Sequence, residues 1–241
     1  MFVTNPAGAD YGLEPVGDGV APLSERTLHV IKEAIVSLQL PPGAHISESF
    51  LSGRLKASRT PIRAALKRLE REGLVRTAPQ RGTFVTKLRE REVRDAAVMR
   101  RLLESWALVE MQRIASFPDL RQLDDLLERQ ARAVEAKSYN QFLHWDTEFH
   151  KAILAAARNL KLLDLYESVN LSILRVRAWL IMERPKALET ALAEHRTMYR
   201  TIAERRWDLL QQLMLASDDE FLVGVSKMRE AHPEYFENAE T

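Results

Sequence analysis

The feature that most constrains this chain is the helical periodicity that it shows from Arg89 onward. Apolar residues recur there at spacings of three and four, in stretches of roughly 90–115, 119–136, 139–157, 160–181, 186–205 and 207–229. Pro118, Pro185 and the polar pair Lys137-Ser138 mark breaks between the stretches. No apolar run reaches roughly 18 residues, so no stretch predicts a membrane span. The pattern predicts an all-helical bundle over residues 89–241.

The preceding segment, residues 23–88, predicts a smaller domain that contains both helices and strands. The predicted elements are a helix containing Leu28, Ile31 and Ile35, a short helix capped by Ser47, a helix capped by Ser58 that runs to about Glu72, and the strands Leu74–Thr77 and Thr83–Thr86. Residues 1–22 are rich in Gly, Pro and Asp and lack periodicity, so they predict a flexible tail.

The charge is unevenly distributed between these parts. The whole chain has 35 Lys and Arg against 34 Asp and Glu, but residues 23–88 hold 12 basic and five acidic residues. A basic domain of this kind suggests a polyanionic partner. The absence of cysteine excludes disulfides, cysteine-based zinc sites and thiol nucleophiles. The start of the chain lacks the order of a signal peptide, so we expect a cytoplasmic protein without a membrane partner.

The predicted third helix has an apolar side and a basic side. The apolar side carries Ile62, Leu66 and Leu69, and the other side carries Arg59, Thr60, Arg63, Lys67 and Arg71. A single exposed arginine is most simply a solvated charge. Here, however, a basic face follows a helix and a tight turn, which is the arrangement that reads the DNA major groove. The hairpin that follows has Gln80-Arg81-Gly82 at its tip, which suits close approach to a minor groove.

The run PPGAHISESFLSGRLKASRTPIRAALKRLEREGLVRTAPQRGTFV resembles the winged helix of the GntR family of bacterial transcription regulators. The resemblance lies in SRTP and EGL, at the two ends of the third helix, and in RGT-x-V of the hairpin. It implies a homodimer that binds an inverted repeat of operator DNA. The residues that it implies at the DNA are Ser49, Ser58, Arg59, Thr60, Arg63, Gln80, Arg81 and Gly82.

Several polar residues of the helical part fall within apolar stripes. Asp146 and His150 lie one turn apart at the centre of one stripe, His195 is central in a later one, and Arg100 lies on the inward side of its helix. Burying such groups costs several kcal/mol unless they are paired or bind a metal. Two interpretations remain open from this pattern: a three-ligand site for Zn²⁺ or a similar divalent ion, or a metal-free hydrogen-bonded network. The four tryptophans are interpreted as core residues.

The segments MRRLLE (99–104), WDTEFHKAILAAARN (145–159) and AEHRTMYRTIAE (193–204) resemble the FCD effector domain, of the FadR-like or VanR-like branch, that follows a GntR-type winged helix. The resemblance implies that Asp146, His150 and His195 bind a divalent metal, zinc or nickel. It also implies that Arg100 holds a small carboxylate effector beside that metal. Arg175 and Arg177 are further candidates, although each is more simply a solvated or helix-pairing charge. Ser217 replaces the histidine that commonly supplies a fourth ligand, and the helical wheel directs it inward. We therefore expect Ser217 to border the effector.

Together these features predict a mainly α chain: a flexible tail (1–22), a winged helix-turn-helix domain (23–88) and an all-helical effector and dimerisation domain (89–241). The favoured function is a transcriptional regulator, a repressor of a metabolic operon, controlled by a small organic acid. The alternative is a metal-dependent hydrolase with an accessory DNA-binding module, because an open metal site can activate water. That reaction needs a general base, and the wheels direct Glu148 and Glu194 away from the inward face.

Overall fold

The computed structural model describes residues 11–184 and 186–238, which form two compact units. One unit comprises the described residues up to Glu90 together with those from Ala231, and the other spans Arg91–Glu230. In chain order the elements are α1 (Leu23–Val36), β1 (His45–Ile46), α2 (Glu48–Leu55), α3 (Arg59–Arg71), β2 (Val75–Ala78), β3 (Gly82–Val85), α4 (Glu90–Arg113), α5 (Leu120–Glu135), α6 (Tyr139–Ala155), α7 (Leu160–Glu183), α8 (Ala187–Ala203), α9 (Trp207–Ala231) and a 3₁₀ turn (Pro233–Tyr235).

The first unit packs three helices against a small antiparallel sheet. The strand order is β1-β3-β2, with His45 opposite Phe84 and Val75 opposite Val85. Ser47 caps α2 as predicted, because its hydroxyl accepts a hydrogen bond from the Phe50 amide at 3.0 Å. The strand β1 was not predicted, since two residues are too few to show an alternating pattern. This arrangement of helices and hairpin is a winged helix-turn-helix.

The ends of the chain also contribute to this unit. Leu13 is buried, and the Val16 amide donates to the Leu55 carbonyl at 3.0 Å, so the part of the predicted tail from residue 11 lies against the folded unit. Residues 1–10 lie outside the described residues. Near the other end, the Leu88 amide donates to the Tyr235 carbonyl at 2.8 Å. The last segment therefore belongs with the first unit, whereas the predicted helical domain ran from 89 to 241.

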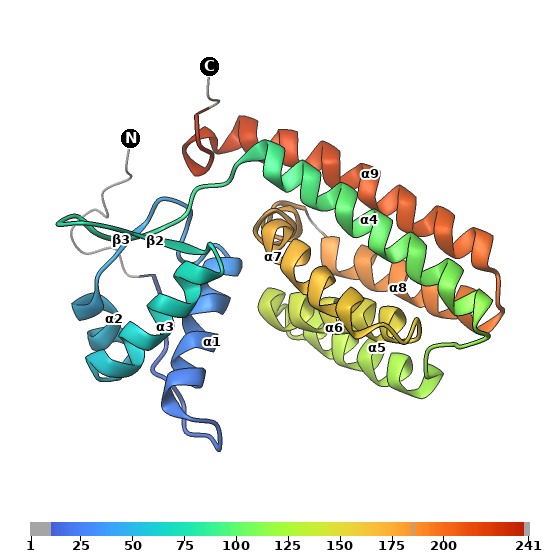
Figure 1. Ribbon diagram of the computed structural model, residues 1–241, viewed down its shortest axis with the longest axis horizontal. Helices are drawn as coiled ribbons and strands as arrows, with labels where there is room; N and C mark the ends of the chain where they lie inside the picture. The colour runs from blue at the N-terminus through green and yellow to red at the C-terminus, as the bar shows by residue number, and fades with distance from the viewer. Residues whose placement is uncertain (1–10, 185, 239–241) are drawn as a thin grey trace. The chain divides into compact units, whose positions relative to one another are not determined.

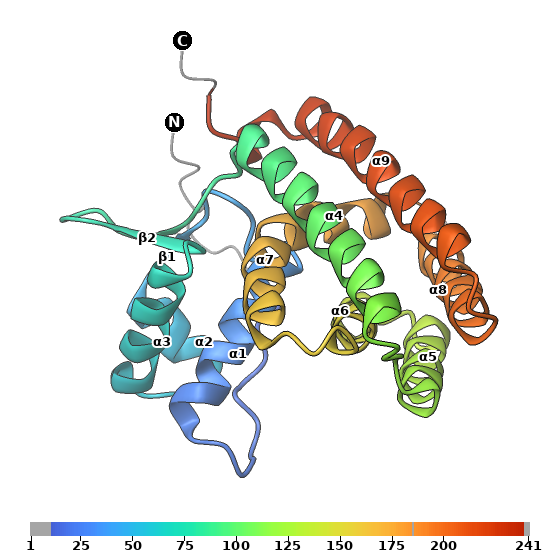
Figure 2. The ribbon, with the colours of Figure 1, turned by 45° about the vertical axis from the view of Figure 1, so that its right-hand side comes forward.

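The second unit is a bundle of the helices α4 to α9. Figure 1 shows α4 and α9 along one side of this unit and α5 and α6 along the other, and the turned view of Figure 2 keeps this arrangement. Arg101 connects α4 to α9 through a 2.8 Å hydrogen bond to Asp219. Large fully buried side chains such as Phe142, Phe149 and Tyr166 fill the interior. The predicted fold class, a winged helix followed by a helical bundle, is confirmed.

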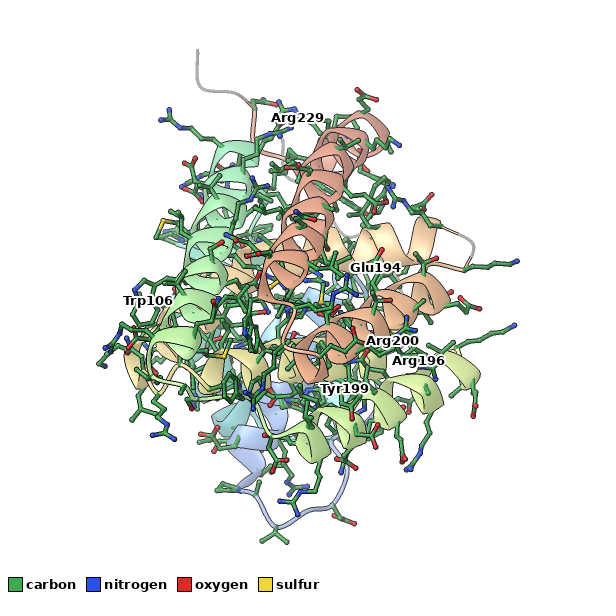
Figure 3. The ribbon with its side chains drawn as sticks, turned by 90° about the vertical axis from the view of Figure 1, so that its right-hand side faces the viewer. Trp106, Glu194, Arg196, Tyr199, Arg200 and Arg229 are labelled. Atoms are coloured by element: carbon green, nitrogen blue, oxygen red, sulfur yellow. The ribbon has the colours of Figure 1, made fainter. Side chains whose placement is uncertain are left out.

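One apolar side chain lies where the sequence did not place it. Trp106 was interpreted as core, yet 43% of its surface is exposed on α4. Figure 3 shows it at the outer edge of this helix. The inward side of α4 instead buries Val93, Ala107 and Met111. The helix thus has an apolar residue on each of two faces, and periodicity alone cannot tell which face meets the bundle.

Candidate DNA-recognition surface and ligand site

The helix α3 presents the two sides that its sequence predicts. Ile62, Leu66 and Leu69 are buried against the rest of the first unit. All eight residues predicted to contact DNA are exposed: Ser49, Ser58, Arg59, Thr60, Arg63, Gln80, Arg81 and Gly82. Their role at DNA stays a prediction. Ser58 is the N-cap residue of α3 as predicted, but within the described residues its side chain makes no capping hydrogen bond. Its hydroxyl is therefore available to a ligand.

Arg63 already has a partner in the free protein. Its Nε lies 2.8 Å from both carboxylate oxygens of Glu48, at the start of α2. The pKa of the Glu48 carboxyl is lowered, chiefly by this hydrogen bond. The pair fixes the direction of the guanidinium at the protein surface. These bonds use only Nε, so Nη1 and Nη2 of Arg63 remain for a contact with a base. Sequence reasoning missed Glu48 because nothing in its local pattern reveals a partner on α3.

The wing is a hairpin whose turn needs unusual backbone angles. Gln80 has φ of 59° and Gly82 has φ of 96°. The Arg81 amide closes the turn by donating to the Ala78 carbonyl at 3.0 Å. A Cβ at Gly82 would collide with the ring of His45 on β1, so the wing depends on a residue without a side chain at this point.

In the second unit, the sequence-predicted polar residues come together in the interior. Asp146 and His150 on α6 and His195 on α8 each offer one ligand atom, and these atoms lie within 4.8 Å of one another. The three side chains are buried. His195 Nε2 lies 3.4 Å from Asp146 Oδ1. This spacing suits donors around a single divalent ion, because ligands about 2.1 Å from a metal lie roughly 3 to 3.5 Å apart.

The second ring nitrogen of each histidine faces an oxygen acceptor. His195 Nδ1 lies 2.7 Å from Gln130 Oε1, and the amide nitrogen of Gln130 donates to the Trp145 carbonyl at 3.3 Å. Gln130 thereby holds its oxygen toward the ring, so Nδ1 carries the proton and Nε2 is left free. His150 Nδ1 lies 3.5 Å from Glu104 Oε1 and makes no hydrogen bond within the described residues. Sequence reasoning missed both outer partners.

Burial determines the charge of the two imidazoles. Desolvation, reinforced by the positive Arg100, holds the pKa of His150 well below its ordinary value. Desolvation also lowers the pKa of His195 to about 4, although the Asp146 carboxylate opposes this shift. Both rings are therefore neutral at pH 7, which is the form that binds a metal.

Two arginines lie beside the cluster, and each is bound to a carboxylate. The Nε of buried Arg100 donates to Glu104 at 2.8 Å, and its Nη1 donates to Asn170 at 3.2 Å. The Nη2 of Arg177, on α7, donates to Asp146 Oδ1 at 2.8 Å. The central position of Arg100 matches its sequence pattern. The contact between Arg177 and Asp146 joins α7 to α6 and could not be read from either helix alone.

These groups border a cavity of about 180 Å³ between α4, α6, α7, α8 and α9. Its polar lining residues are Arg100, Glu104, Asp146, His150, Arg177, Arg184, Thr190, Glu194, Ser217 and Glu220. Ser217 lines it, in agreement with the direction of the wheel, whereas His195 does not border it. Glu194 also lines the cavity, so its predicted direction was wrong. A volume of this size suits a small metabolite rather than a drug-sized ligand.

The two units together define a class of protein: a DNA-binding winged helix joined to a helical ligand domain. Residues 23–85 match the bacterial regulatory proteins of the gntR family, and residues 95–217 match the FCD domain. The chain belongs to the GntR family and carries an FCD domain. It is a DNA-binding transcriptional regulator and not an enzyme, so the alternative hydrolase hypothesis is wrong.

Three known proteins illustrate the similarity. The chain is 25% identical over 215 residues to the HTH-type transcriptional repressor RspR of Escherichia coli (strain K12), covering 89% of this chain and 94% of that protein. It is 30% identical over 181 residues to the Nta operon transcriptional regulator of Aminobacter aminovorans, covering 75% and 84%. The structure of E. coli McbR/YncC shares its fold, with a TM-score of 0.72, 19% identity and coverage of 87% and 99%. No helix in the described ranges is long and apolar enough to cross a membrane.

Proposed function

We propose that this regulator is a homodimeric repressor whose operator affinity is controlled by a small organic acid bound beside a divalent metal. The observation that carries the proposal is the buried Asp146, His150 and His195 cluster, two members of which open onto the cavity that Arg100 lines. A repressor among its relatives, RspR, supports the direction of control.

The donor set fits a metal such as zinc or nickel. One carboxylate oxygen and two neutral imidazole nitrogens would hold the ion, and Gln130 orients one of the two rings. A bound ion would supply positive charge and open coordination positions for a carboxylate. Ser217 stands where a fourth ligand is common in such domains, so solvent or effector would complete the coordination.

Arg100 would make the second contact with the acid, in addition to the metal. Its hydrogen bonds to Glu104 and Asn170 use Nε and Nη1, which leaves Nη2 for a ligand in the cavity. Glu104 and Asn170 fix the guanidinium in place before the ligand arrives. A charge-assisted bond from this buried group would distinguish an acid from its neutral amide.

The proposed interface of the homodimer is the outer face of α4. Apolar side chains between 43% and 59% exposed line this face: Val98, Met99, Leu102, Trp106 and Val109. An exposed apolar stripe of this kind marks an interaction surface. We assign it to a second copy because an inverted repeat requires two winged helices related by two-fold symmetry. An effector would weaken operator binding only if it favours the DNA-incompetent arrangement.

A thermal-shift screen of small carboxylates, with and without Zn²⁺ or Ni²⁺, tests the effector site, because a ligand of the native state raises its apparent stability. We expect a metal and an acid together to raise the melting temperature more than either alone. Acids that bind should release operator DNA in a fluorescence anisotropy assay. If no metal is retained and acids bind equally well without it, Arg177 and Asp146 form the metal-free network instead.

A further inference from the structure

The charged groups of the cavity wall are paired, with one exception. Each of its three arginines contacts a different carboxylate: Arg100 contacts Glu104, Arg177 contacts Asp146, and Arg184 contacts Glu220. The first pair lies within α4, the second joins α7 to α6, and the third joins the residue directly after α7 to α9. Each pair balances its own charge, and Arg100 keeps Nη2 as a donor for a ligand.

Glu194 is the exception. It lies on α8 and lines the cavity, and Figure 3 shows it beside α9. Within the described part of the chain this half-buried carboxylate makes no hydrogen bond or ion pair. The cavity wall therefore carries one carboxylate whose acceptor capacity is unused.

Apolar residues of α7 separate two of the arginine pairs of the cavity wall. Arg177 and Arg184 are seven residues apart, about two helical turns, which corresponds to about 10 Å along a helix. Arg177 marks the end that holds Asp146 and His150, and Arg184 marks the end at Glu220. Leu180 and Ile181 line the wall between them. A metal held by Asp146 and the imidazoles would add positive charge beside Arg177.

From this arrangement we infer that the cavity binds a small amino acid, with its carboxylate toward Arg100 and its protonated amine on Glu194. This inference rests on the proposed function, since it names the chemical class of the effector. An ammonium group supplies three donors and one positive charge, which is what the Glu194 carboxylate lacks. A simple acid would place an apolar end beside this carboxylate and leave it unsatisfied.

Calorimetry on the full chain, with and without Zn²⁺, tests the inference with matched probes. The probes are β-alanine, γ-aminobutyrate and δ-aminovalerate, each compared with the acid that lacks only the amine: propionate, butyrate and valerate. We expect at least one amino acid to bind roughly ten- to a hundredfold more tightly than its parent acid, which is the usual value of a charge-assisted bond. The chain-length series varies the separation between the carboxylate and the amine of the ligand.

The variant Glu194→Gln should abolish this preference. Glu189→Gln, the same change at an exposed site on α8 outside the cavity wall, should keep it. A preference that survives Glu194→Gln, or a parent acid that binds as tightly as its amino acid in the wild type, overturns the inference. In the second case binding of the parent acid still supports the proposed function. If none of the six probes binds, with or without metal, the inference fails, and the thermal-shift screen of other carboxylates decides the proposed function separately.

Discussion

At the tip of the wing, the backbone of Gly82 occupies the left-handed region, with φ of 96°. Any other residue would be strained there, and its Cβ would strike the His45 ring. The ring itself is held against Phe84, with the two ring centres 5.0 Å apart. A single position therefore couples the conformation of the wing tip to the packing of β1 on β3.

The first prediction follows from this coupling. Gly82→Ala should lower the free energy of unfolding by about 1–2 kcal/mol and weaken operator binding, because both the strain and the His45 collision disturb the wing. Thermal unfolding and fluorescence anisotropy measure the two effects. Gly53→Ala is the matched control: Gly53 lies within α2 with open space around its Cβ position, so this change should stabilise the protein by up to about 1 kcal/mol. Equal effects of the two changes would contradict the prediction.

A second prediction at this scale concerns Ser217, which lines the cavity with Asp146 and His150. Ser217→His should tighten metal binding, because it supplies a further imidazole where the cluster has three donors. Ser217→Met should leave the amount of bound metal nearly unchanged, whereas His150→Ala and His195→Ala should each release the metal. Metal content after dialysis against a chelator gives the comparison. If Ser217→His retains no more metal than the wild type, Ser217 does not face the ion.

At the scale of elements, periodicity predicts the six helices of the bundle because each must bury one apolar stripe. It also orients Asp146, His150 and Arg100 correctly, since a side chain's direction follows from its position on its own helix. It does not give the pairing of Arg177 with Asp146, which depends on how α7 packs on α6. The same reason explains the errors at Trp106 and Glu194: a wheel has no information about the neighbouring helices.

The recognition helix α3 carries the third prediction. Arg59→Ala and Arg63→Ala should each cost about 1–3 kcal/mol at the operator if the two arginines make bidentate base contacts. Lys67→Ala, on the same exposed side, should weaken binding to all sequences alike and lower the salt slope by about one, as expected of a phosphate contact. Anisotropy titrations with the operator and with a scrambled duplex, over a range of salt, separate the two classes. A double Arg59 and Arg63 variant that still discriminates the operator would disprove the assignment.

At the scale of the whole molecule, an operator with two half-sites binds a dimer more tightly than a monomer, because the second winged helix binds at a high effective concentration. Any change that separates the two copies should therefore weaken operator binding without touching the DNA surface. The apolar face of α4 is the surface on which this dependence can be tested. Leu102 lies in the middle of that face and is 57% exposed.

Leu102→Glu should convert the dimer to a monomer, because it would bury a carboxylate against apolar side chains of both copies. Sedimentation velocity should show the change in mass, and operator affinity should fall while the melting temperature of the monomer's helices changes little. Leu160→Glu is the matched control, since Leu160 is an isolated leucine, 80% exposed at the start of α7. It should remain dimeric and bind operator normally. If the Leu102→Glu protein stays dimeric, the two-fold interface lies on another face of the chain. If it becomes a monomer and keeps full operator affinity, DNA recognition does not depend on the dimer.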